Sequence, residues 1–332
     1  MSFSKFFLAV AAVPSFALLT SALDVNSNTN VVVYYGQGDD QQRLSHFCGE
    51  TSLDIINLGF VNEFPDQAPG GWPGSNFGNQ CGSGTYTNED GEATDLLSEC
   101  IQLAEDIPVC QAAGKTVLLS LGGASPTNQQ IESHDSAIAF ADFLWGAFGP
   151  VDDTWIANNG PRPFGGAVVD GFDFDIENNG GYGYATMVKR LREHFADYPD
   201  QTFYISGAPQ CVIPDPQLAH AITHSEFDFV WVQFYNTEEC AASNSDGFNY
   251  DDWVTFLQQG ESANAKLMIG LPADTDSDYY LTPDQVNSLV ETEIAAYPDT
   301  FGGIMIWEAT SSDENVIDDM TYAENMKSVL VA

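Results

Sequence analysis

Eight short runs of β-branched and aromatic residues alternate with helix-like segments, and this alternation constrains the fold of the chain more than any other feature. Each run is bounded by Gly, Pro, Asn or Asp, as β-strands usually are. The predicted strands are residues 31–35, 55–60, 116–120, 171–177, 203–206, 229–234, 267–271 and 303–307. The clearest predicted helices between them are residues 93–113, 138–148, 185–198, 253–259 and 283–297.

The number and order of these segments predict an α/β fold, a (β/α)8 TIM barrel whose parallel strands are covered by helices. The alternative is an open doubly wound sheet, which usually carries a glycine fingerprint after its first strand. Residues 36–40 (Gly-Gln-Gly-Asp-Asp) lack that fingerprint. Only about 30 residues separate Leu271 from Gly303, which is enough for one loop and one helix. We therefore predict a single barrel domain without a large insertion between strands seven and eight.

The first 22 residues have the features of a secretory signal peptide. Lys5 precedes an apolar stretch, residues 6–19, and small residues follow at 20–22. Pro14 interrupts the stretch, which is also short for a membrane span. We predict a signal peptide over residues 1–22, a barrel over residues 23–332, and an extracellular protein that is either free or attached to the cell wall.

The cysteines and the net charge agree with export. Six cysteines without a C-x-x-C pair predict disulfides, although their spacing leaves the pairing open. The net charge of −39 excludes nucleic acid and an anionic membrane surface as partners, because both require a basic surface. We expect the acidity to keep the protein soluble; attraction of a cationic, partly deacetylated polysaccharide is the alternative.

No pattern in the sequence predicts a metal or a cofactor. The five histidines have no H-E-x-x-H spacing. Residues 274–278 begin like a calcium loop, but Tyr279 and Gln285 stand where an EF-hand needs Gly and Glu. We predict that the protein uses neither a metal nor a cofactor.

The fourth predicted strand carries three carboxylates on one face, because side chains two residues apart point the same way. These carboxylates belong to Asp173, Asp175 and Glu177, and the opposite face carries Phe172, Phe174 and Ile176. A barrel strand packs its outward face on helices, so the apolar residues must point outward and the carboxylates inward. Glu177 should then lie nearest the carboxyl ends of the strands, where the active sites of such barrels are found.

Three inward carboxylates indicate a catalytic site rather than an acidic surface that only keeps the protein soluble. They are spaced by about 7 Å along the strand, so they repel one another and lose hydration, and at least one should have the raised pKa that a general acid needs. A solvated acidic face is the alternative, but Val168 and Val169 favour a central strand. Asp170 lies at odd spacing from the three and is expected to be structural.

The acidic strand resembles the D-G-x-D-x-D-x-E signature of glycoside hydrolase family 18, in particular plant-type class III chitinases and their fungal relatives. Ser120, Gly122 and Gly123 match the family's S-x-G-G motif. Residues 34–37, 208–211, 231–236, 270–273 and 303–307 resemble further strand ends of the family, although a tryptophan is more usual where Tyr35 stands. The resemblance covers essentially the whole chain after residue 22.

The resemblance implies a role for each site residue. Glu177 would protonate the glycosidic oxygen, and the 2-acetamido oxygen of the substrate would attack the anomeric carbon. Asp175 would orient the acetamido group and share a proton with Asp173, while Tyr235 would hydrogen-bond the acetamido oxygen. The implied substrate-binding residues, with Trp307 as the floor under the sugar, are Tyr34, Phe60, Gly123, Gln233, Asn236 and Trp307. The implied disulfides are Cys48–Cys110, Cys81–Cys100 and Cys211–Cys240.

The remaining residues favour the same mechanism. A retaining glycosidase usually needs a second carboxylate as nucleophile, but the ends of the other predicted strands carry mainly aromatic and amide residues. We therefore predict a monomeric, secreted endochitinase that cleaves β-1,4 bonds of chitin or chitooligosaccharides in an open groove. The alternatives are an endo-β-N-acetylglucosaminidase that acts on N-glycans and a non-catalytic chitin-binding protein.

Overall fold

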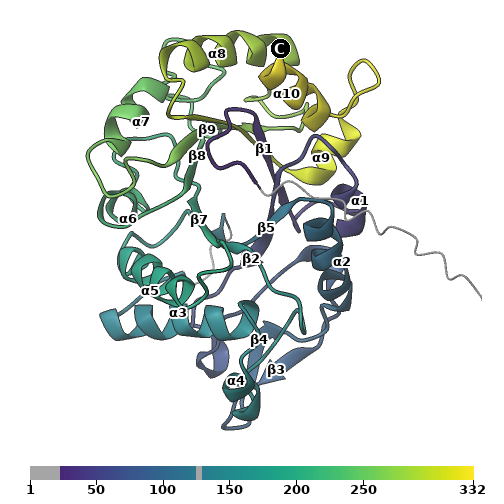
Figure 1. Ribbon diagram of the computed structural model, residues 1–332, viewed down its shortest axis with the longest axis vertical. Helices are drawn as coiled ribbons and strands as arrows, with labels where there is room; N and C mark the ends of the chain where they lie inside the picture. The colour runs from purple at the N-terminus through teal and green to yellow at the C-terminus, as the bar shows by residue number, and fades with distance from the viewer. Residues whose placement is uncertain (1–22, 125–128) are drawn as a thin grey trace, which may run out of the picture.

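The computed structural model describes residues 23–124 and 129–332, so the predicted signal peptide lies outside the described residues. Eight parallel strands close into a barrel, and Figure 1 shows them as a central ring with the helices outside it. In barrel order the strands are β1 (Asn30–Tyr35), β2 (Ile55–Val61), β5 (Thr116–Gly123), β6 (Gly171–Ile176), β7 (Tyr204–Gly207), β8 (Phe229–Gln233), β9 (Lys266–Pro272) and β10 (Phe301–Trp307). The predicted TIM barrel is confirmed, and every predicted strand is present.

The helices of the described ranges connect these strands. They are α1 (Leu44–Cys48), α2 (Ile101–Ala112), α3 (His134–Phe148), α4 (Asp153–Ala157), α5 (Tyr184–Ala196), α6 (Ala219–His224), α7 (Tyr250–Leu257), α8 (Pro283–Ala296), α9 (Ala309–Glu314) and α10 (Tyr322–Val331). Only α8 lies between β9 and β10, as the short spacing predicts. In the part of the chain that the structure covers, no helix combines the length and apolarity needed to cross a membrane.

The predicted helix over residues 93–113 is wrong in its first part and confirmed in its second. Residues Ala93–Leu97 form strand β4, which pairs antiparallel with β3 (Thr85–Thr87), and helix α2 begins only at Ile101. Figure 1 shows this hairpin beside α4 at one end of the molecule. Within β4, Thr94 and Leu96 are buried while Ala93 and Asp95 are exposed, so the strand's alternation outweighs the helix propensity of its alanine and leucines.

Two apolar layers surround the strands. The outer layer lies between barrel and helices and contains Phe172, Phe174 and Ile176. The inner layer fills the barrel and includes Tyr34 and Trp231, both almost fully buried. The prediction for the two faces of β6 is therefore confirmed. Its apolar side chains belong to the outer layer, and the carboxylates of Asp173 and Asp175 face the interior of the barrel.

Three aspartates tie the amino-terminal edge of the barrel together. Each directly precedes a strand and accepts a hydrogen bond from the N–H of the second residue of the strand before it, and each also holds a side chain from a covering helix. The backbone pairs are Asp54 with Val31 (2.8 Å), Asp170 with Val117 (2.8 Å) and Asp228 with Ile205 (2.7 Å). The helix partners are Lys327, Gln111 and Arg192, respectively. Asp170 is therefore structural, as its odd spacing predicts.

Replacing Asp170 with alanine is expected to lower the free energy of unfolding by about 1–3 kcal/mol, because the N–H of Val117 would lose its partner in a buried position. Urea denaturation measures this change. Asp170→Asn is the matched control, since its amide oxygen can still accept from Val117. Equal destabilisation by the two variants would show that the hydrogen bond is not the stabilising element.

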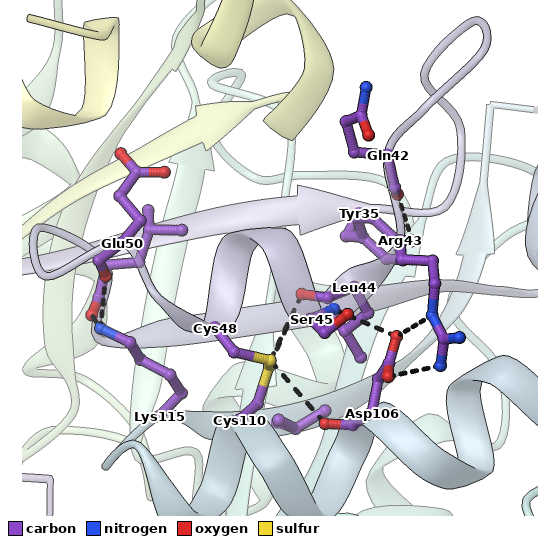
Figure 2. Close-up of a disulfide and its surroundings, with 12 residues drawn as sticks. Tyr35, Gln42, Arg43, Leu44, Ser45, Cys48, Glu50, Asp106, Cys110 and Lys115 are labelled. Carbon is purple, nitrogen blue, oxygen red and sulfur yellow. Dashed lines mark hydrogen bonds and ion pairs between the residues drawn. A yellow bond between two sulfur atoms is a disulfide. The ribbon is translucent and has the colours of Figure 1, made fainter.

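Three disulfides fasten the connections, and they are the pairs that the resemblance implies: Cys48–Cys110, Cys81–Cys100 and Cys211–Cys240. Figure 2 shows the first, which joins α1 to α2. Beside it, the guanidinium of Arg43 donates to both oxygens of Asp106 at 2.9 and 2.7 Å. The covalent and ionic links together fix the segment that follows β1, whose end forms part of the barrel mouth.

Candidate active site

A close contact between β5 and β6 shapes the mouth of the barrel. Gly122 has a φ of 107°, and a Cβ at this position would lie 2.2 Å from the backbone oxygen of Asp175. The next residue, Gly123, has a φ of 82° and lies against the ring of Phe60. Gly122 therefore lets β5 approach the acidic strand where an alanine would collide with it, and Gly123 leaves room for the ring of Phe60.

Asp173 is fully buried and held by three hydroxyl groups. Its Oδ2 accepts from the hydroxyls of Tyr34 (2.7 Å) and Ser120 (2.6 Å), and its Oδ1 accepts from Ser206 (2.7 Å). The indole N–H of Trp231 donates in turn to the Tyr34 oxygen at 3.0 Å, which fixes the direction of the chain of hydrogen bonds. Burial raises the pKa of Asp173 to about 6, although the hydroxyl donors oppose that shift.

Asp175 and Glu177 occupy the next two inward positions. Burial raises the pKa of Asp175 well above its usual range, and the charges of Glu177 and Asp173 raise it further. The side-chain amide of Gln233 donates to Asp175 Oδ1 at 2.8 Å and to the backbone oxygen of Ala208 at 3.1 Å. Burial also raises the pKa of the half-buried Glu177. The predicted crowding of carboxylates is present, with the electrostatic consequence expected of it.

Aromatic side chains surround the carboxylates. Tyr235 is almost fully buried, and its pKa is raised first by burial and then by the charges of Asp175 and Glu177. Trp307, at the end of β10, packs on Tyr34 and Phe60 with ring centroids 5.5 and 6.2 Å apart. The structure thus gathers the candidate residues Tyr34, Phe60, Gly123, Gln233, Tyr235 and Trp307 at the barrel mouth. Asn236 follows Tyr235 as an exposed residue with a φ of 60°, so its role in substrate binding stays a prediction.

Trp307 separates two hollows at the carboxyl ends of the strands. One has a volume of about 160 Å³ and is lined by Phe60, Asn62, Gly123 and other ends of β2 and β5. The other, of about 690 Å³, lies over the loops after β1, β9 and β10. Gln37 lines both hollows together with Trp307. An extended ligand could therefore lie across Trp307 with one part in each hollow.

Three polar residues near the carboxylates have contacts that the sequence does not predict. Ser120 and Ser206 stand beside Asp173 because the registers of β5 and β7 with β6 place them there. Asp215 lies outside any strand, and its Oδ atoms accept from the backbone N–H groups of Gln210, Gln217 and Leu218. Strand alternation identifies the two serines as inward-facing, but no local pattern relates Asp215 to the carboxylates.

Asp215→Asn is expected to move the alkaline side of the activity profile to lower pH, by roughly one pH unit or less. After burial, the charge of Asp215 is a further cause that raises the pKa of Glu177, and the predicted role of Glu177 is that of a general acid, which acts only while it is protonated. Removing that charge lowers the pKa of Glu177, so activity should be lost at a lower pH as the pH rises. The profile of kcat against pH measures the effect. If kcat falls at the same alkaline pH as in wild type while the melting temperature is lower, Asp215 has a purely structural role.

The chain is similar in sequence to known proteins. The sequence profile described as glycosyl hydrolases family 18 matches residues 30–299. The chain is 63% identical to Endochitinase A of Aspergillus niger over 330 residues, or 97% of this chain and 26% of that protein. It is 58% identical to Endochitinase A1 of Aspergillus fumigatus over 336 residues, or 99% of this chain and 40% of that protein. The chain thus spans between a quarter and two fifths of the length of these two relatives.

Solved structures share the fold. A chitinase from Ipomoea carnea matches with a TM-score of 0.72 and 30% identity, covering 90% of this chain and 99% of that one. A xylanase and α-amylase inhibitor protein from Scadoxus multiflorus matches with a TM-score of 0.72 and 27% identity, covering 91% of this chain and 98% of that one. Because the family profile extends over most of the barrel and the relatives align over nearly all of the chain, this protein belongs to glycosyl hydrolases family 18.

Proposed function

We propose that this chain is the catalytic barrel of a secreted endochitinase, which hydrolyses internal β-1,4 bonds between N-acetylglucosamine units by substrate-assisted, retaining catalysis. The observation that carries the proposal is the row of Asp173, Asp175 and Glu177 along and just after β6, with Tyr235 close enough for their charges to raise its pKa in addition to burial. Relatives at 63% and 58% identity that are named endochitinases support it.

Each side chain has a separate task in the proposed reaction. Glu177, whose raised pKa favours the protonated form, donates its proton to the glycosidic oxygen. Trp307 supports the sugar whose anomeric carbon reacts. Tyr235 and Asp175 bind the acetamido group of that sugar. The positive charge that develops as the oxazolinium ring forms favours the ionised form of Asp175, whose carboxylate then stabilises that charge. Asp173 completes the row and is positioned by Tyr34.

The surroundings of the other buried carboxylates support a nucleophile that comes from the substrate. Glu308 directly follows Trp307, but its oxygens accept from the backbone N–H groups of Thr310 (2.9 Å) and Ser311 (2.8 Å) at the start of α9. Asp215 is occupied by three backbone N–H groups. Neither is free to form a glycosyl–enzyme ester. We propose that the acetamido oxygen of the substrate is the nucleophile instead, which would restrict the substrate to 2-acetamido sugars.

The groove and the disulfides support the rest of the proposal. The short connection between β9 and β10 leaves the hollows open, so a long chain can bind at internal positions rather than only at its end. Three disulfides are typical of a protein that folds in an oxidising compartment. We therefore propose that residues 1–22 direct export and that the barrel acts outside the cell on chitin as a monomer.

Chitin hexamer, colloidal chitin and a high-mannose glycopeptide are the substrates that test this function. We expect cleavage of the first two at internal bonds and no release of the N-glycan. Proton NMR of the first hexamer products should show the β-anomer, because the acetamido group and then water attack from opposite faces. An initial α-anomer would exclude the substrate-assisted route. Glycopeptide cleavage without chitin cleavage would favour an endo-β-N-acetylglucosaminidase, and binding of chitin without any cleavage would favour a lectin-like protein.

A further inference from the structure

Tyr182 is an unusual surface residue. Its side chain is 59% exposed, and it is the one aromatic residue among the strongly exposed large hydrophobic side chains of the described ranges. A single exposed apolar side chain is common on protein surfaces, so this ring becomes informative only together with its surroundings. Tyr182 lies in the loop between β6 and α5, only five residues after Glu177.

A hollow of about 520 Å³ lies beside this ring. Its walls include His134 at the start of α3, Thr186 in α5, Pro216 and His220. Among the described residues that line this hollow there is no Asp, Glu, Lys or Arg, although the chain carries 48 acidic residues and six of them line the hollow of about 690 Å³ beside Trp307. A neutral hollow with an aromatic ring, an apolar wall and hydroxyl and imidazole groups suits an uncharged, polyhydroxylated ligand rather than an ion.

The loop that carries Tyr182 is held in place on both sides. The side chain of Gln217 accepts from the N–H of Gly180 at 2.6 Å and donates to the backbone oxygen of Glu177 at 3.5 Å. Gly181 lies so close to this neighbouring loop that a Cβ would be 2.3 Å from the Gln217 backbone oxygen. Gly183, with a φ of 90°, ends the loop immediately before α5. The loop that carries the ring is therefore fixed by these contacts. Because Gln217 bonds both Gly180 and Glu177, the loop is also held at a defined position relative to Glu177.

The barrel places this hollow on the leaving-group side of Glu177. In a closed barrel of eight strands, β6 and β10 are four strands apart and face each other across the mouth. Trp307 ends β10, and the loop with Tyr182 follows β6. A chain whose reacting sugar rests on Trp307 passes Glu177 at the scissile bond and continues toward Tyr182.

We propose that Tyr182 and its hollow bind the leaving-group half of the substrate, with the phenol ring stacked on the apolar face of a β-1,4-linked N-acetylglucosamine unit. The proposal rests on the function proposed above for Glu177 and Trp307. His134, Thr186 and His220 supply polar groups for the hydroxyls at the edge of that sugar. This site would favour long chains over short ones and would act on binding rather than on the chemical step.

The test compares wild type with Tyr182→Ala on chitin hexamer and on an aryl chitobioside, whose small leaving group does not reach the hollow. We expect the ratio of kcat/KM for the hexamer to that for the aryl substrate to fall about tenfold, which corresponds to roughly 1.4 kcal/mol. Tyr182→Phe should restore most of the ratio, because stacking needs the ring and not the hydroxyl. Val109→Ala, at an exposed position on α2 outside the hollow, is the control for loss of an exposed apolar side chain.

A binding measurement separates this proposal from the catalytic one. In a Glu177→Gln background, the Kd of chitin hexamer should rise about tenfold when Tyr182→Ala is added. An unchanged Kd and an unchanged ratio of kcat/KM would overturn the Tyr182 site while leaving the chitinase function intact. If wild type binds the hexamer but does not cleave it, the proposed activity fails, and the two Kd values still decide whether Tyr182 binds the chain.

Discussion

Glu177→Gln is expected to lower kcat on chitin hexamer by about 10²- to 10⁴-fold, the usual contribution of a positioned general acid. Glutamine has nearly the same shape as glutamate but no acidic proton, so the leaving oxygen would depart unprotonated. The substrate contacts at Trp307 and Tyr235 remain in this variant, and KM should therefore change much less than kcat.

The leaving group gives a sharper form of the same prediction. An aryl chitobioside with a dinitrophenol leaving group needs little protonation, so Glu177→Gln should lose far less activity on it than on the hexamer. Asp170→Asn is the matched control, because Asp170 begins the same motif but binds Val117 at the opposite edge of the barrel. If the Glu177→Gln variant cleaves colloidal chitin at the wild-type rate, another group donates the proton.

Asp175→Asn should reduce kcat on the hexamer by roughly 10²- to 10³-fold, as expected when one electrostatic contact to the transition state is removed. Asp175 is only 2% exposed, so water screens its charge very little and the attraction to the positive oxazolinium ring is strong. The asparagine oxygen can still accept the hydrogen bond from Gln233, so the local packing should survive.

Inhibitor binding checks whether the loss at Asp175 is electrostatic. A stable thiazoline mimic of the ring-closed intermediate should bind the Asp175→Asn variant much more weakly than wild type, while the melting temperature changes little. Unchanged affinity for the mimic, together with a lower melting temperature, would mean that Asp175 supports the barrel rather than the intermediate.

Much of the site follows from short-range rules that any reader of the sequence can apply. Alternation along a strand has a period of two, so it separates Asp173, Asp175 and Glu177 from Phe172 and Phe174 without knowledge of the neighbours. Strand composition and spacing likewise predict the eight strands and the short connection after Leu271. These features depend on the local backbone and on burial of one face, and both are encoded within a few residues.

These short-range rules give the wrong result at residues 93–97, where they predict a helix and the structure has strand β4. Ala93 and Leu97 favour a helix in isolation, but β3 offers these residues a partner strand and buries Thr94 and Leu96. The partner lies in a loop that the Cys81–Cys100 disulfide holds against the start of α2. The choice between helix and strand here is decided by contacts that the segment itself does not contain.

The sequence by itself determined the barrel, the order of its strands and which carboxylates point inward, because periodicity is a local property of the chain. Only the tertiary structure decided which groups surround those carboxylates. Strand register sets Ser120 and Ser206 beside Asp173, barrel closure brings Trp231 to Tyr34, and a loop after β7 carries Asp215 close enough to raise the pKa of Glu177. Register, closure and loop path depend on packing between distant segments, and these contacts set the proton affinities in the site.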